Sequence, residues 1–172
     1  MPHPLTTTRI VATFALLLGA TSNASGQMFV ATGRDTLRGL TGVEVVVEAL
    51  EEDLERDGLM RVAIQADVER WLRARGIAVY ASQSANPSDA KAYLYVHVNS
   101  LKLARQSLYV IAVQVQLRQT LRSLVTPSNI VDAMTWDAHD VLAVPIGTVE
   151  SVRESIQEYV DQFIRDWMAV HR

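Results

Sequence analysis

The chain contains no cysteine among its 172 residues. This absence excludes a disulfide-stapled scaffold, a cysteine nucleophile and metal sites built on thiolates. It also excludes a lipid-modified cysteine at the end of a leader, as in a conventional bacterial lipoprotein.

Basic residues are few and do not cluster. The sequence has 16 Lys and Arg against 19 Asp and Glu, a formal net charge of -3. Only Arg9 precedes position 27, so the rest of the chain has 15 basic and 19 acidic residues, a charge of about -4. Binding to nucleic acid requires several convergent cations. We therefore expect no nucleic-acid partner.

The common motifs of catalysis and cofactor binding are missing as well. The sequence has no Gly-Xaa-Ser-Xaa-Gly elbow, no Walker-type phosphate loop and no Gly-Xaa-Gly-Xaa-Xaa-Gly fingerprint. We predict a protein that is not an enzyme and that needs no cofactor.

The N-terminal segment has the three parts of an export signal. Arg9 is followed by an apolar run over residues 10–20 and by the small residues Ala24, Ser25 and Gly26. Eleven helical residues span about 16 Å, too short for a hydrocarbon core of about 30 Å. This pattern predicts a signal peptide over residues 1–26.

An uncleaved membrane anchor is the alternative interpretation of this segment. No charged residue occurs between Arg9 and Arg34, so residues 10–31 would contact the membrane if the leader is retained. The anchor would then include Ile10, Phe14, Leu16, Leu17 and Leu18. Both interpretations place the remainder in the periplasm, either soluble or anchored to the inner membrane.

Hydrophobic periodicity predicts one α+β domain over residues 43–172, preceded by a linker over residues 27–42. Strands are predicted over residues 43–50, which are rich in β-branched side chains, and over residues 77–81 and 129–137. Alternation with period two predicts a hairpin within residues 93–117. Helical spacing predicts helices over residues 59–75 and 148–169, the second capped by Thr148. The expected order is β-α-β-β-β-β-α.

The hairpin predicts how the layers are arranged. Leu94, Val96 and Val98 share one face of its first strand, and the parity changes at Leu101, which suggests a bulge near Asn99 and Ser100. We expect a two-layer sandwich: a mostly antiparallel sheet of about five strands, with both helices on its aliphatic face.

The acidic segment over residues 51–58 has part of the pattern of a calcium-binding EF-hand loop. Asp53, Glu55, Asp57 and Gly58 match the first, third, fifth and sixth positions of an EF-hand loop. Ile64 stands at the twelfth position, where a bidentate Glu is required. We interpret the segment as a solvated loop.

A second polar cluster is the best source of metal ligands. Asp132, Asp137, His139 and Asp140 lie within nine residues, but a metal site needs three or four converging ligands with support behind them. The ordinary interpretation is a polar strand end, and we predict no metal site.

The polar and aromatic face of the hairpin is the candidate partner surface. Tyr93, Tyr95 and His97 have the same parity, so they share one side of the sheet. Tyrosine buries a large area at low entropic cost and is frequent in contact patches. The alternative is that a loop or the leader covers this face.

Three stretches carry a resemblance to known proteins. They are Leu37-Arg38-Gly39-Leu40, the strand over residues 93–99 (Tyr-Leu-Tyr-Val-His-Val-Asn), and the end of the last helix at Met168-Ala169-Val170. In these stretches and in element order the chain resembles exported bacterial α+β envelope proteins of uncharacterised function. It is also similar to small accessory domains that sit beside larger membrane assemblies.

These observations favour a non-catalytic exported domain that binds a protein partner. It would be an accessory or structural subunit docking at the periplasmic face of a membrane protein complex. Two other hypotheses remain: a periplasmic carrier of a small apolar ligand held between sheet and helices, and a metal-dependent hydrolase at Asp137, His139 and Asp140.

Overall fold

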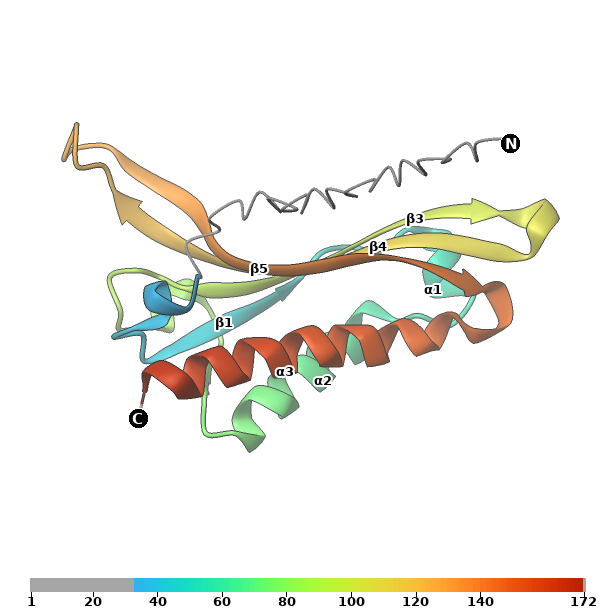
Figure 1. Ribbon diagram of the computed structural model, residues 1–172, viewed down its shortest axis with the longest axis horizontal. Helices are drawn as coiled ribbons and strands as arrows, with labels where there is room; N and C mark the ends of the chain where they lie inside the picture. The colour runs from blue at the N-terminus through green and yellow to red at the C-terminus, as the bar shows by residue number, and fades with distance from the viewer. Residues whose placement is uncertain (1–32, 172) are drawn as a thin grey trace, which may run out of the picture. The chain divides into compact units, whose positions relative to one another are not determined.

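The computed structural model describes residues 33–171, and it confirms the predicted α+β class (Figure 1). A five-stranded sheet forms one layer, and the helices α2 and α3 lie together on one of its faces. In order, the helices and strands are η1 (Gly33–Leu37), β1 (Gly42–Val47), α1 (Glu52–Arg56), α2 (Arg61–Ala74), β2 (Ala78–Tyr80), η2 (Gln83–Ala85), β3 (Tyr93–Leu103), η3 (Ala104–Gln106), β4 (Leu108–Arg122), β5 (Ile130–Pro145), η4 (Ile146–Ser151) and α3 (Val152–Val170).

The strand order is β2-β1-β3-β4-β5, and the sheet is mixed. β1 runs parallel to both of its neighbours, β2 and β3. α2 carries the chain back between β1 and β2, and residues 81–92 carry it back between β2 and β3. β3, β4 and β5 form an antiparallel meander. The longest pairings are thus antiparallel, while β1 sits inside the sheet between two parallel partners.

The core lies between the sheet and the two long helices. Alternate residues of β3 and β4 are buried, as the period-two pattern predicted. α3 supplies a matching apolar stripe, whose buried members are Val152, Ile156, Val160, Phe163, Ile164 and Trp167. Each fully buried aliphatic or aromatic side chain of this kind contributes about 1.5–3 kcal/mol relative to an exposed one.

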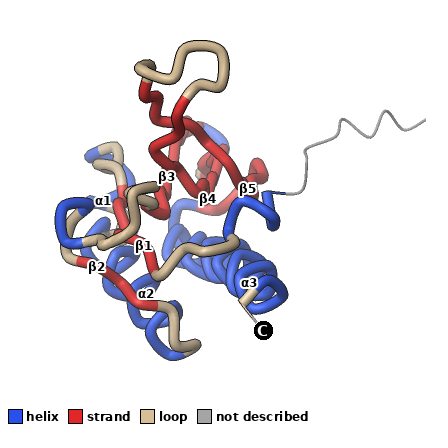
Figure 2. The backbone as a smooth tube through the Cα atoms, turned by 90° about the vertical axis from the view of Figure 1, so that its left-hand side faces the viewer, coloured by secondary structure: helices blue, strands red, loops and turns tan. Residues whose placement is uncertain are grey.

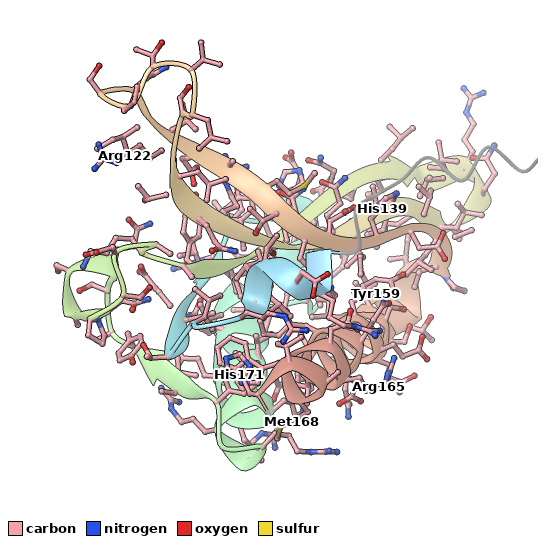
Figure 3. All side chains as sticks on the ribbon, turned by 60° about the vertical axis from the view of Figure 1, so that its left-hand side comes forward. Arg122, His139, Tyr159, Arg165, Met168 and His171 are labelled. Atoms are coloured by element: carbon pink, nitrogen blue, oxygen red, sulfur yellow. The ribbon has the colours of Figure 1, made fainter. Side chains whose placement is uncertain are left out.

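The core also includes residues N-terminal to β1. Leu37 and Leu40 are buried although they fall in the stretch that we expected to be a linker. His171 closes this region from the other end of the chain: its ring stacks on Trp167 and its Nε2 lies 2.9 Å from the carbonyl oxygen of Leu40 (Figure 3). Within residues 33–171, the packed core therefore includes η1.

The predicted bulge at Asn99 and Ser100 was wrong. β3 and β4 pair without interruption from Tyr93 opposite Arg118 to Leu103 opposite Leu108. Leu101 consequently points to the open side of the sheet and is 60% exposed. The irregularity lies one strand further on, between β4 and β5, where the register shifts at Leu117 and Arg118.

Three other local expectations also need correction. The acidic segment expected to be a loop contains the short helix α1, and Gly58 then turns the chain with a φ of +113°. The last strand continues to Pro145, beyond Asp137, because it pairs with β4 without a break from Trp136 opposite Leu117 to Pro145 opposite Leu108. Thr148 lies within η4, and Ser151 occupies the N-cap position of α3.

β4 and β5 extend beyond the helical layer at the end where they are joined. Figure 1 shows this part of the hairpin rising away from the helices, and Figure 2 shows its connecting loop projecting beyond the rest of the domain. A bulge bends a strand and increases its twist, which accounts for the change of direction. We call residues 119–134 the hairpin arm.

Candidate functional site

The face of the sheet opposite α2 and α3 carries a mixed set of polar and aromatic side chains. Strand pairing aligns Tyr95 with Gln116 and Asp137, and His97 with Gln114 and His139. We call this set the polar-aromatic patch: Tyr93, Tyr95, His97, Gln114, Gln116, Arg118, Asp137 and His139, each half-buried or exposed.

The three residues of the predicted partner surface form a column along β3. Tyr93 meets Tyr95 edge to face, with ring centroids 6.4 Å apart, and Tyr95 stacks on His97 at 6.1 Å. Residues two apart on a strand point to the same side, so the column follows from the strand itself. The structure thus brings all three together as predicted; whether a partner binds them stays a prediction.

Arg118 contacts Tyr93, the first residue of this column. Its guanidinium donates to the Tyr93 Oη at 2.9 Å and to the Asp132 Oδ2 at 2.7 Å, and the Tyr93 Oη donates to the same carboxylate oxygen at 2.9 Å. Burial and the hydrogen bond to Asp132 raise the pKa of Tyr93, so its hydroxyl stays protonated at neutral pH. The hydrogen bond to Asp132 likewise raises the pKa of Arg118.

Two imidazole–carboxylate pairs stand on either side of Gln114. His97 Nδ1 contacts the Glu48 carboxylate, and its Nε2 contacts the Asn99 carboxamide. His139 Nδ1 lies 2.7 Å from the Asp137 Oδ2. These contacts fix the orientation of both rings on the sheet surface. The arrangement offers hydrogen-bond donors, acceptors and ring faces to a partner.

The four candidate metal ligands do not converge. Asp132 binds Arg118, and Asp137 binds His139 on the open face. Asp140 has the opposite parity and lies on the helical side, where its charge adds to burial in raising the pKa of Tyr159. Within residues 33–171, no group of three or more His, Asp or Glu could hold a metal ion.

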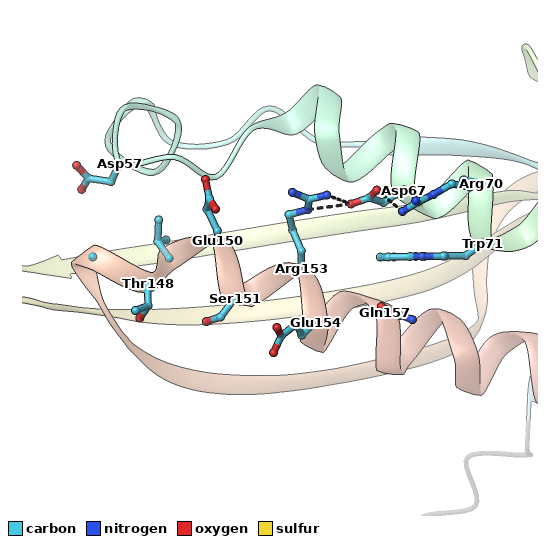
Figure 4. A pocket seen from close by; sticks show the side chains of 12 residues that line it. Asp57, Asp67, Arg70, Trp71, Thr148, Glu150, Ser151, Arg153, Glu154 and Gln157 are labelled. Carbon is cyan, nitrogen blue, oxygen red and sulfur yellow. Dashed lines mark hydrogen bonds and ion pairs between the residues drawn. The ribbon is translucent and has the colours of Figure 1, made fainter.

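The helical face has a separate groove of about 730 Å³ between α2 and the start of α3 (Figure 4). The carboxylate of Asp67, 8% exposed, lies at its side and accepts hydrogen bonds from Arg70 at 2.6 Å and from the Arg153 Nε at 2.8 Å. The groove is lined mainly by charged and polar side chains. The Arg153 pair ties α3 to α2, whereas Arg70 and Asp67 both belong to α2. Sequence reasoning did not find the Arg153 pair because it joins residues 86 positions apart.

A third polar cluster joins the turn after α1 to the helical side of β3 and β4. The Asp57 Oδ2 accepts hydrogen bonds from the Lys102 Nζ at 2.6 Å and from the Tyr109 Oη at 2.7 Å. Both donors lower the pKa of Asp57, while burial and the bond to Asp57 raise the pKa of Tyr109. Asp57, which we interpreted as part of a solvated loop, therefore locks that turn onto the sheet.

Sequence reasoning found the β3 part of the patch and missed its neighbours on β4 and β5. Parity along β4 puts Gln114, Gln116 and Arg118 on one side of that strand, but it does not show which residues of β3 and β5 lie beside them. The missing information was the register between strands. It decides that Asp137 lies in the same row as Tyr95, and His139 in the same row as His97. A one-residue slip would have moved them to the other face.

Comparison with known proteins supplies no family for this chain: no protein-family model matches it, and no curated protein matches it either. Across residues 33–171, none of the helices combines the length and the apolar character needed to cross a membrane. The predicted anchor residues Ile10, Phe14, Leu16, Leu17 and Leu18 lie outside the described residues.

Proposed function

We propose that this protein is a non-catalytic, exported interaction domain, an accessory or structural subunit that docks through the polar-aromatic patch. Its partner is a membrane protein complex, approached from the periplasmic face. The observation that carries this proposal is the ordered column of Tyr93, Tyr95 and His97 on the sheet face that neither α2 nor α3 covers.

The patch has the physical properties of a contact surface. Tyrosine and arginine are among the residues that most often dominate binding energy at protein interfaces, and both occur here in fixed orientations. Arg118 is held by Asp132, and His97 by Glu48, so little side-chain entropy is lost when a partner covers them. The sheet beneath is rigid because its other face is packed against two helices.

The expected location follows from the leader. Both interpretations of residues 1–31 place the remainder of the chain in the periplasm, and the anchored form would hold the patch close to membrane complexes. A domain of this kind contributes by binding and positioning, and the proposal assigns it no cofactor.

We expect a substitution at the centre of the patch to release the protein from its complex. Gln116→Arg places a long cation between Tyr95 and Asp137, where it blocks close approach of a partner surface. Gln83→Arg makes the same chemical change at an exposed position in η2. Native electrophoresis of gently solubilised membranes should show the wild type and Gln83→Arg in a larger assembly, and Gln116→Arg as the free chain.

Two results would contradict the proposal. The wild-type chain could migrate alone, in which case it has no stable partner in the membrane. Alternatively, Gln116→Arg could stay in the assembly as fully as Gln83→Arg does, in which case the partner binds another surface. A far-UV circular dichroism spectrum of each variant controls for loss of fold.

A further inference from the structure

The hairpin arm concentrates the exposed apolar side chains of this domain. Eleven large hydrophobic residues are exposed within residues 33–171, and six of them belong to the arm. They are Leu121, Leu124, Val125, Ile130, Val131 and Met134, and the two at the tip, Leu124 and Val125, are 97% and 93% exposed. Neither helix underlies this part of the sheet (Figures 1 and 2).

These side chains surround the arm. Leu121 and Val131 are cross-strand partners on one of its faces, whereas Ile130 and Met134 lie on the other face, opposite Arg122 and Arg118. Leu124 and Val125 occupy the loop that joins the strands. A flat protein partner would bury one face and leave the other in water, but an apolar medium that surrounds the tip would cover both.

The charges of the arm are also arranged asymmetrically. Residues 123–131 contain no charged side chain, and Arg122 stands exposed beside the loop (Figure 3). The acid of this region, Asp132, is already paired with Arg118. The projecting end is therefore apolar and then cationic, on a chain whose formal net charge is -3. An apolar tip followed by a cationic side chain complements the acyl chains and anionic headgroups of a phospholipid surface.

The backbone of the tip satisfies several of its own polar groups. Ser123 N donates to Asn129 O at 3.0 Å, and Asn129 N donates to Thr126 O at 2.8 Å. Thr126 N donates to the Ser123 hydroxyl at 3.2 Å, and the Arg122 guanidinium donates to the carbonyl oxygen of Pro127 at 2.6 Å. Internal pairing lowers the cost of moving a loop out of water into the headgroup region.

The arm is also fixed at its base. The buried Gln119 side chain donates to the Thr135 hydroxyl at 2.7 Å and to the carbonyl oxygen of Thr36 at 3.1 Å. These bonds hold the bulge at Thr135 and tie it to η1, so the arm keeps its direction relative to the domain. A rigid projection delivers its tip to a surface without losing conformational entropy on contact.

We propose that the hairpin arm is a membrane-contacting wedge: Leu124 and Val125 enter the interfacial layer of an anionic phospholipid bilayer, and Arg122 binds its phosphates. The wedge uses a different surface from the polar-aromatic patch. It orients the domain on the bilayer and leaves the patch for a protein.

The absence of cysteine allows a direct test with the full-length chain. Ser128→Cys, labelled with an environment-sensitive fluorophore, places a probe at the exposed tip and keeps Leu124 and Val125. Val62→Cys on α2, where the native side chain is 63% exposed, is the matched control. The labelled proteins are mixed with vesicles of phosphatidylethanolamine and phosphatidylglycerol, with and without a spin-labelled acyl chain as quencher.

We expect the emission at position 128 to shift to the blue and to be quenched by the spin-labelled lipid, while position 62 is unaffected. Adding Leu124→Ser and Val125→Ser to the position 128 probe should weaken vesicle binding by about tenfold, because two aliphatic side chains no longer leave water. Gln116→Arg should leave the lipid response unchanged, so failure of the wedge and failure of the patch are distinguishable.

Each of the other outcomes overturns the proposal. Equal responses at positions 128 and 62, or no response at 128, would show that the tip stays in water. A blue shift that grows with protein concentration in the absence of lipid would assign the arm to a second copy of this chain. A shift in native membranes but not in protein-free vesicles would assign it to a membrane protein.

Discussion

Asp57 shows how one side chain can hold a turn against the sheet. Lys102 and Tyr109 donate to its carboxylate and lower its pKa below the ordinary value of 3.8. Because the folded-state pKa lies below that of the unfolded chain, the ionised carboxylate stabilises the fold above pH 3.8, and this contribution is lost as the pH falls below that value.

We therefore expect Asp57→Asn to be less stable than the wild type at neutral pH. The difference in urea midpoint should shrink as the pH falls through and below 3.8, because the wild-type carboxylate is then protonated too. Asp89→Asn, a change at an exposed acid, is the control and should leave the midpoint unchanged. A difference between wild type and Asp57→Asn that does not vary with pH would contradict the assigned cause.

At the scale of elements, η1 packs against β5 through a glycine. A Cβ on Gly33 would lie within 2.3 Å of the carbonyl oxygen of Thr135, so any larger residue must push η1 away from the bulge. Gly33→Ala should lower the free energy of unfolding by about 1–3 kcal/mol, the usual cost of overpacking.

Gly147→Ala is the matched control for this prediction, since a Cβ at that position meets nothing within 4 Å. It should change stability by no more than about 0.5 kcal/mol. Both values come from chemical denaturation followed by circular dichroism. Equal effects of the two substitutions would mean that η1 does not pack closely on β5 in solution.

The same elements show what the sequence could predict. The alternation in β3 and β4 and the apolar stripe of α3 predicted these elements and their buried faces, because burial imposes the periodicity directly. Short elements were harder to predict from the sequence. The acids of α1 resemble those of a solvated loop, and the bulge at Thr135 depends on contacts with Gln119 and η1 that have no local signature.

At the scale of the whole molecule, the two layers could be predicted from the sequence, but the order of the strands in the sheet could not. The residues of β1 carry no signal that both of its neighbours run parallel to it. Pairing across 49 positions brings Glu48 to His97, and 86 positions separate Asp67 from Arg153. The β3 column of the patch was therefore predictable, whereas its completion by β4 and β5 required the register.

The two layers should unfold together, because a single core joins them. The ring of Phe163 on α3 lies 5.3 Å from that of Trp136 on β5 and 5.8 Å from that of Trp167, and its side chain is fully buried. Phe163→Ala should lower the free energy of unfolding by about 3–5 kcal/mol. Met168→Ala, on the same helix but 42% exposed in the native protein, should cost no more than about 0.5 kcal/mol.

Tryptophan fluorescence reports the helical layer and its contact with β5, through Trp71 on α2, Trp167 on α3 and Trp136 on β5. Far-UV circular dichroism reports the secondary structure of both layers. If one core couples them, the two signals change at the same denaturant concentration in the wild type and in Phe163→Ala. Separate transitions would mean that the sheet retains its structure after α3 has left it. The polar-aromatic patch would then rest on the strands alone, and its rigidity would not depend on the helical layer.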